Sequence, residues 1–295
     1  MYKVRKLHGE LLLGSFGTKI VELIASWVVV LLITGIFIWW PVRGWKLQGL
    51  FIPRFNKGKK ILFRDLHAIT AFWISGLLLL VLAGGFPWTD IVGNNFKQLQ
   101  KVTNTGYPLT WMGIGIPTEK TDKTVTLDEI VKKAYALDLP GTITIDFPKG
   151  PSGVYSVSNT YYKDLDKQQK VHYSQYSGEV VLHQTWKDVG FLMRGRMWVM
   201  AFHQGQFGKW NWWLMLSIAI LFAITSLAAI VSYFSKKEKG KWVVPNVPKS
   251  FTVSKLVIVS IIILGLLFPL FGISAFLIFI IERFKKKVKI KEEIL

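Results

Sequence analysis

Long apolar stretches alternate with polar segments along the chain, and their lengths give the first prediction. Four stretches are mainly apolar, namely 18–40, 66–88, 210–234 and 251–281. Each is long enough to cross a hydrocarbon core of roughly 30 Å, which needs about 20 helical residues. Only helices suit such segments here, because backbone amides in lipid must be satisfied within their own segment. The pattern therefore predicts a membrane all-α helical bundle of about four transmembrane helices.

The fourth stretch is longer than one crossing requires, and Pro269 interrupts it. A single bent span would leave the basic residues of 283–291 outside, against the tendency of such segments to stay in the cytoplasm. A hairpin turning near Pro269 would return them, but each of its arms would be too short to span fully. We expect one bent span, with the hairpin as the alternative.

Between the second and third apolar stretches the periodicity changes. Residues 127–137 place their apolar side chains on one helical face, and Thr126 precedes them as the expected N-cap. Four short alternating segments then predict strands: TITIDF, GVYSVSN, KVHYSQY and GEVVLHQ. A helix followed by an antiparallel meander predicts a small α+β domain inserted between the spans.

The predicted layout has four parts. They are residues 1–88 with transmembrane helices 1 and 2 and the basic loop 41–65, a linker at 89–120, the α+β domain at 121–190, and residues 191–295 with helices 3 and 4 and a basic tail. The linker is expected because 89–120 is rich in Gly, Asn and Thr.

The charges orient this layout. The net charge is +19, and it is concentrated in the loops 41–65 and 235–250, whereas 89–209 holds 14 basic and 11 acidic residues. Short basic loops beside spans are retained in the cytoplasm. We therefore expect a multi-pass protein of a bacterial cytoplasmic membrane, with 89–209 extracytoplasmic. Topology explains the basic stretches without a nucleic-acid partner, and the absence of cysteine excludes disulfides and iron–sulfur clusters.

Three histidines stand at the ends of apolar stretches. His67 opens the second stretch at the inner interface, whereas His8 precedes the first and His203 the third, both at the outer interface. Ionisable residues at such depths usually face the bundle interior or a bound group. Two imidazoles at one level on different helices would suit bis-histidine ligation of a b-type haem. Cations near them could pair with the haem propionates, namely Lys19, Lys209 and Arg64.

A plainer interpretation stays open, because histidine at a membrane interface often caps a helix or meets lipid headgroups. His172 and His183 fall in the strand region and are expected to be ordinary surface or sheet residues. No pattern joins a nucleophile, a base and an orienting acid, and no Walker loop or dinucleotide fingerprint is present.

The chain resembles the PepSY-associated transmembrane family, the iron-regulated bacterial membrane proteins, in the stretches that contain the three histidines at span ends and in the α+β segment. The resemblance runs from residue 7 to about residue 280, through LHGELLLG…TGIFIWWP, RDLHAITAFWISGLLLL…GGFPW, TLDEIVKKA…GVYSV…YSGEVV and AFHQGQFGKWN. It implies that the α+β domain is PepSY-like.

Family members characterised as ferric-siderophore reductases look like di-haem b proteins that carry electrons across the membrane. By this resemblance His8 and His203 would ligate the outer haem, and His67 one side of an inner haem. The chain would then hold one or two haem b groups and reduce ferric siderophore or another iron complex outside, with an unknown cytoplasmic electron donor.

The start of the chain differs from the family pattern, in which another span with a histidine at its inner end comes first. This chain begins just before His8, so we expect the partner of His67 to be missing from it. A homo-oligomer could supply that ligand from another copy.

Two other functions compete with electron transfer. One is a haem-free, membrane-anchored PepSY module that binds peptides or regulates a protease. The other is an accessory to a siderophore importer without redox activity.

Overall fold

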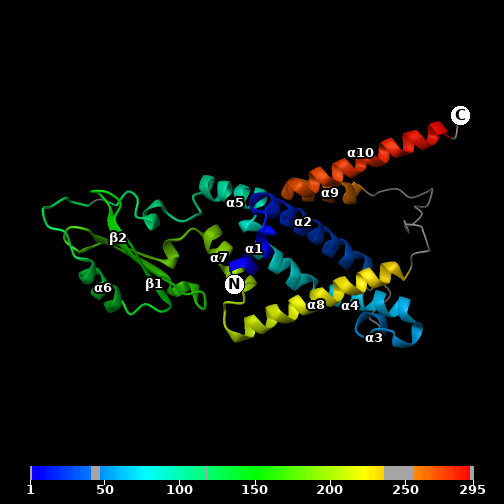
Figure 1. The fold of residues 1–295 in the computed structure, drawn as a ribbon, viewed down its shortest axis with the longest axis horizontal. Coiled ribbons are helices and arrows are strands. Elements are labelled where there is room, and N and C mark those ends of the chain that lie inside the picture. Colours follow the sequence, from blue (N-terminus) through cyan, green and yellow to red (C-terminus); the bar gives the residue numbers. More distant parts are fainter. Residues whose placement is uncertain (1, 41–46, 117, 236–254, 293–295) are drawn as a thin grey trace. The chain divides into compact units, whose positions relative to one another are not determined.

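The computed structural model describes residues 2–40, 47–116, 118–235 and 255–292. They fall into two compact units (Figure 1). The membrane unit comprises Met1–Asn94 and Leu216–Leu295, and the sheet unit comprises Asn95–Met215. Apart from Ser235, the predicted basic loop 235–250 lies outside the described residues.

Helices build the membrane unit. They are α1 (Tyr2–Glu10), α2 (Gly14–Trp39), α3 (Leu47–Leu50), α4 (Lys59–Gly85), most of α8 (Lys209–Phe234), α9 (Lys255–Leu267) and α10 (Pro269–Glu292). Three helical segments are long and apolar enough to cross a membrane, namely Gly14–Trp39, Lys59–Trp88 and Lys209–Phe234. They confirm the first three predicted spans. Helix α4 begins inside the predicted loop 41–65, so its first turn carries part of that basic charge.

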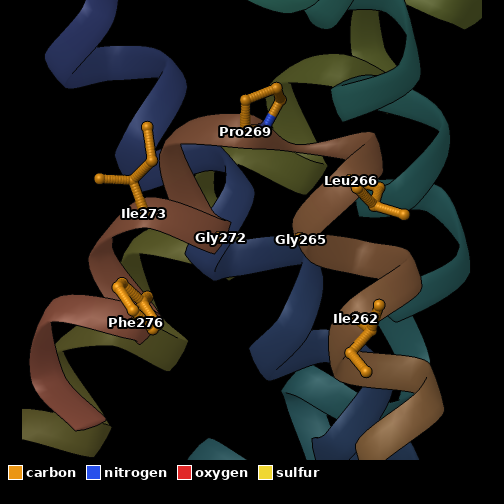
Figure 2. Close-up of a pocket in the computed structure, with 7 residues that line it drawn as sticks. All are labelled: Ile262, Gly265, Leu266, Pro269, Gly272, Ile273 and Phe276. Atoms are coloured by element: carbon orange, nitrogen blue, oxygen red, sulfur yellow. The ribbon is translucent and has the colours of Figure 1, made fainter. Parts of the chain in front are cut away.

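The prediction of a single bent span at 251–281 is wrong. The helix breaks at Phe268, and α9 and α10 run side by side as a hairpin (Figure 2). Proline at the start of α10 cannot continue the preceding helix, because it lacks an N–H group and its ring crowds the turn before it. Gly265 and Gly272 then let the arms touch, since a Cβ on Gly272 would lie 2.7 Å from the oxygen of Gly265.

The tip of this hairpin packs against α2 and the end of α4. The rings of Phe268 and Phe86 lie 4.7 Å apart, and those of Phe271 and Trp27 lie 4.9 Å apart in an edge-to-face arrangement. The Trp27 indole also donates a 3.0 Å hydrogen bond to the Ser274 hydroxyl. Aromatic pairs of this kind stabilise a contact by more than the buried area alone would. These contacts therefore fix the hairpin to the spans.

A buried carboxylate joins α2 to the helix that follows α4. Glu22 is fully buried in the first span, and its two oxygens accept the backbone N–H groups of Ile91 and Val92, each at 2.9 Å. These amides open α5 (Ile91–Val102), where a helix N-terminus has unsatisfied donors and attracts negative charge. A charge at this depth is tolerated because it is bonded in this way.

The sheet unit contains the predicted helix and meander. Helix α6 (Leu127–Ala136) starts at Thr126, which forms a capping box with Glu129. The antiparallel sheet has the order β1-β2-β3-β4, with β1 (Thr142–Asp146), β2 (Val154–Thr160), β3 (Gln169–Ser174) and β4 (Val180–Thr185). Helix α6 covers one face of it (Figure 1) through Ile130 and Ala134. Helix α7 (Phe191–His203) follows the sheet.

The segment predicted as a linker at 89–120 differs from that expectation. It contains α5 and a 3₁₀ turn, Leu109–Met112, which lies on the second face of the sheet. The Gln184 side chain donates a 2.9 Å hydrogen bond to the Thr110 hydroxyl, and Trp111 joins a buried cluster with Trp186. Both faces of the sheet are therefore covered within this unit.

We predict that Glu22→Ala destabilises the protein by about 2–4 kcal/mol, because two buried amides lose a charged acceptor. Glu22→Gln should lie between this variant and the natural protein, since it keeps one good acceptor. Thermal unfolding in detergent, followed by tryptophan emission, measures the effect.

The control for this measurement is Glu10→Ala. Its side chain is 35% exposed and pairs with Lys6 on the same helix, 3.4 Å away, so its loss should cost no more than about 0.5 kcal/mol. Equal effects of the two alanine variants would show that Glu22 does not hold the start of α5.

Candidate functional site

His67 lies in α4 and is oriented by the neighbouring span. Its Nδ1 lies 3.1 Å from the backbone oxygen of Thr225 in α8. A carbonyl oxygen can only accept a hydrogen bond, so Nδ1 is the donor, and in the tautomer that binds metals Nε2 carries the lone pair. Within the described parts of the chain, Nε2 has no hydrogen-bond partner. The imidazole is thus held by one nitrogen and can bind a metal through the other.

The position beside His67 is polar although it is buried. Thr225 is only 5% exposed, and its hydroxyl has no hydrogen-bond partner among the described residues. Buried polar groups in proteins are normally bonded, so an unsatisfied hydroxyl here requires an explanation. A bound group with polar atoms at this level would provide one.

An ion pair fixes the first turns of α4, on which His67 stands. Asp65 is fully buried and accepts two 2.7 Å hydrogen bonds from the Arg54 guanidinium. Arg64 adds a further contact to the same carboxylate at 3.1 Å. Removing one partner of such a pair would leave a buried charge uncompensated. The pair therefore fixes the segment before α4 to the first turns of this helix.

His203 is the last residue of α7, in the sheet unit, and it is partly buried. The turn after it is held by Asn211, which is fully buried. The Asn211 amide donates to the oxygen of Phe202 at 3.1 Å, and its oxygen accepts the N–H of Phe207 at 3.2 Å. The backbone next to His203 is therefore fixed on both sides of the turn.

His8 lies in α1 of the membrane unit, and its side chain is exposed. Because His8 and His203 belong to different units, their pairing on one iron stays a prediction from the sequence. Two of the cations expected to face propionates form ion pairs with carboxylates of the chain. Lys19 pairs with Asp90 at 2.6 Å, and Arg64 pairs with Asp65.

Arg196 is a buried cation that the sequence analysis did not single out. It stands in α7 seven residues before His203, and seven residues make almost two full helical turns, so the two share one side of the helix. Its side chain is 7% exposed and its Nη1 donates to the Gln100 oxygen at 3.4 Å. Burial lowers the pKa of Arg196, and the nearby Tyr107 acts in the opposite direction. An arginine in the mainly apolar stretch 191–203 was the available signal.

His172, expected to be an ordinary surface or sheet residue, is a sheet residue at the centre of a buried polar network. Its Nε2 donates to the Gln184 oxygen at 3.3 Å, and its Nδ1 accepts from the Ser156 hydroxyl at 2.8 Å. Burial lowers the pKa of His172. Strand alternation placed it opposite the face of α6, but the sequence did not show that Thr110 and its neighbours cover that face. His183 is exposed, as expected for a surface residue.

These elements define a class of protein: a multi-pass membrane protein whose spans carry an inserted α+β domain. The described residues hold no group of three or more His, Asp or Glu side chains that would bind a bare metal ion. A haem needs only axial ligands from the protein, so this finding does not bear on haem.

Comparison with protein families gives the same class and a family. Residues 1–240 match the family described as the PepSY-associated TM region, so the chain belongs to that family. A search of curated proteins found no match. The resemblance noted in the sequence is therefore confirmed at the level of the family.

We predict that the sheet unit loses stability as the pH falls. The pKa of His172 is lowered in the folded state from its usual value of about 6.5. The unfolded chain then binds the proton more readily, so this contribution is fully present above about pH 6.5 and declines below it, until the folded-state pKa is passed. Hydrogen exchange of peptides from 154–185 in the whole protein, corrected for intrinsic rates, measures the effect.

His172→Gln should flatten this pH dependence, because glutamine does not titrate. The control is His183→Gln, at an exposed position of the next strand, which should keep it. An unchanged profile in the His172 variant would assign the acid sensitivity to other groups.

Proposed function

We propose that the protein binds b-type haem within its transmembrane helices and passes electrons across the membrane to a ferric complex. The observation that carries this proposal is the bond from His67 Nδ1 to the oxygen of Thr225. Histidines that bind metals usually donate their second ring N–H to a carbonyl or carboxylate, which fixes the ring and makes it a better ligand. His67 makes a contact of this kind through Nδ1, and Nε2 would be the ligand atom.

The residues present fit the group. His67 offers a partly buried imidazole next to α8, and the unsatisfied hydroxyl of Thr225 belongs to the residue whose backbone oxygen it contacts. His203 would bind from the end of α7, next to the turn that Asn211 holds, with His8 as its partner on the outer haem. Arg196, buried on the same side of α7 as His203, would neutralise a carboxylate of the cofactor. When bound, haem supplies a one-electron carrier that the amino acids of this chain do not provide.

The charge of the loops gives the expected orientation of the protein in the membrane. The basic loops 41–65 and 235–250 would lie in the cytoplasm of a bacterium and the sheet unit on the other side of the cytoplasmic membrane. Electrons would then come from a cytoplasmic donor and reach ferric siderophore or another iron complex outside, in support of iron uptake. The nature of this acceptor rests on the family resemblance. The enzymatic class would be a ferric-siderophore reductase.

The competing interpretation is a haem-free module that binds a peptide or regulates a protease through the sheet unit. Helix α6 covers one face of the sheet and the Leu109–Met112 turn lies on the other, so a peptide would have to bind elsewhere. An accessory to a siderophore importer, without redox activity, is the remaining alternative. The presence of haem separates the electron carrier from both.

We predict that the purified protein, expressed in cells supplied with haem, shows the sharp α band of reduced b-type haem. His67→Ala, and separately His203→Ala or His8→Ala, should remove one haem each, because each deletes an axial ligand. A pyridine haemochrome assay gives the haem content per chain, and His183→Ala is the control because that side chain is exposed in the sheet unit.

Colourless protein from haem-replete cells would contradict the proposal. Haem loss from the His183 variant equal to that from the His67 variant would show that the assay reports on folding and not on ligation. If His67 holds a haem with a ligand from a second copy, the haem content should fall when the oligomer is dissociated.

A further inference from the structure

The helical hairpin of α9 and α10 lies beyond residue 240, where the match to the family ends. Its arms meet through Gly265 and Gly272, and apolar residues line the groove beside them (Figure 2). Ile262, Leu266 and Phe276 flank this groove and are more than half exposed, as expected for side chains that face lipid.

The tip of the hairpin marks one end of the membrane unit. Phe268 touches Phe86, which directly follows α4, and the same end holds the bond between Glu22 and the start of α5. The opposite end, here named the basic end, is where α4 begins at Lys59 and α8 ends at Phe234. The contact between His67 and Thr225 shows that these two helix ends share one level. The hairpin therefore points its tip away from the basic end.

Each arm of the hairpin is too short to cross the whole hydrocarbon core. Helix α9 has 13 residues, which span roughly 20 Å at 1.5 Å per residue. The apolar part of α10, residues 269–281, has the same length, and the hydrocarbon core is roughly 30 Å thick. Starting from the tip, both arms run back toward the basic end. A chain that entered there must also return there.

The charge of the sequence agrees with this path. The apolar part of α10 is followed directly by Glu282 and then by a cationic segment, defined here as residues 283–291. It holds Arg283, Lys285, Lys286, Lys287, Lys289 and Lys291. The segment 236–249 before the hairpin is also basic, so both ends of the hairpin carry the same sign.

We propose that α9 and α10 form a re-entrant hairpin, which enters and leaves the bilayer at the basic end, and that the cationic segment binds anionic phospholipid headgroups there. Clusters of four to eight Lys or Arg beside a membrane helix attract anionic headgroups. This proposal does not depend on haem.

The absence of cysteine gives a direct test of the path. Single cysteines are placed at Ile290→Cys in the tail, at Asn56→Cys beside the basic end, and at Ser152→Cys in an exposed turn of the sheet unit. A membrane-impermeant maleimide is applied to intact spheroplasts and to inverted vesicles. Ile290→Cys should react from the same side as Asn56→Cys, several-fold more than from the side of Ser152→Cys. Reaction from the side of Ser152→Cys would overturn the proposal.

Binding to headgroups is tested on the same tail cysteine, labelled with a fluorophore that responds to its environment. The protein is reconstituted in nanodiscs of phosphatidylcholine alone or with phosphatidylglycerol. Emission should shift toward that of a membrane-bound probe only with the anionic lipid, and about 1 M salt should reverse the shift because the Debye length falls to about 3 Å. Identical emission in both lipids would overturn the lipid partner.

A matched pair of variants separates this effect from general charge. Lys285→Gln, Lys286→Gln and Lys287→Gln together should abolish the lipid-dependent shift. Lys120→Gln, Lys123→Gln and Lys132→Gln together remove the same charge from exposed positions of the sheet unit and should leave it unchanged. Equal losses in both triple variants would contradict binding by the cationic segment.

Discussion

Polar groups inside lipid need partners from the chain itself, and this constraint organises the membrane unit. Three polar side chains in the spans of this unit find such partners in different ways. Glu22 accepts two amides at the start of α5, Asp65 accepts the guanidinium of Arg54, and His67 donates to a carbonyl of α8. Each bond joins the residue's own span to another segment, so the groups that are costly to bury also fix how the helices meet.

Local patterns predicted much of this fold, because they depend on neighbours in the chain. The apolar periodicity gave the first three spans, and Thr126 gave the start of α6. Contacts between distant residues were beyond such patterns. The hairpin needs Gly272 to meet Gly265 and Phe268 to meet Phe86, and only the structure shows these pairs. The proline at its turn was visible, but its effect depends on the surface against which the tip packs.

The candidate site also has a part that local patterns predicted and a part that depends on distant contacts. Histidines at span ends could be selected from the sequence because ionisable residues are costly there. The hydrogen bond that orients His67 joins residues 158 positions apart, and the burial of Arg196 depends on the packing of α5 beside α7. The pairing of His8 with His203 on one iron stays a prediction. His172 was placed in its strand, but the network around it needed the cover that residues 109–112 provide.

The acceptor of the His67 bond is a main-chain atom, and this has an evolutionary consequence. Any side chain that keeps α8 helical presents the same oxygen at residue 225, so substitutions there need not disturb the imidazole. Selection on the ring orientation would leave no coupled changes between the two positions. A survey of sequence covariation would therefore overlook the contact, whereas a substitution that bends α8 locally would affect it at once.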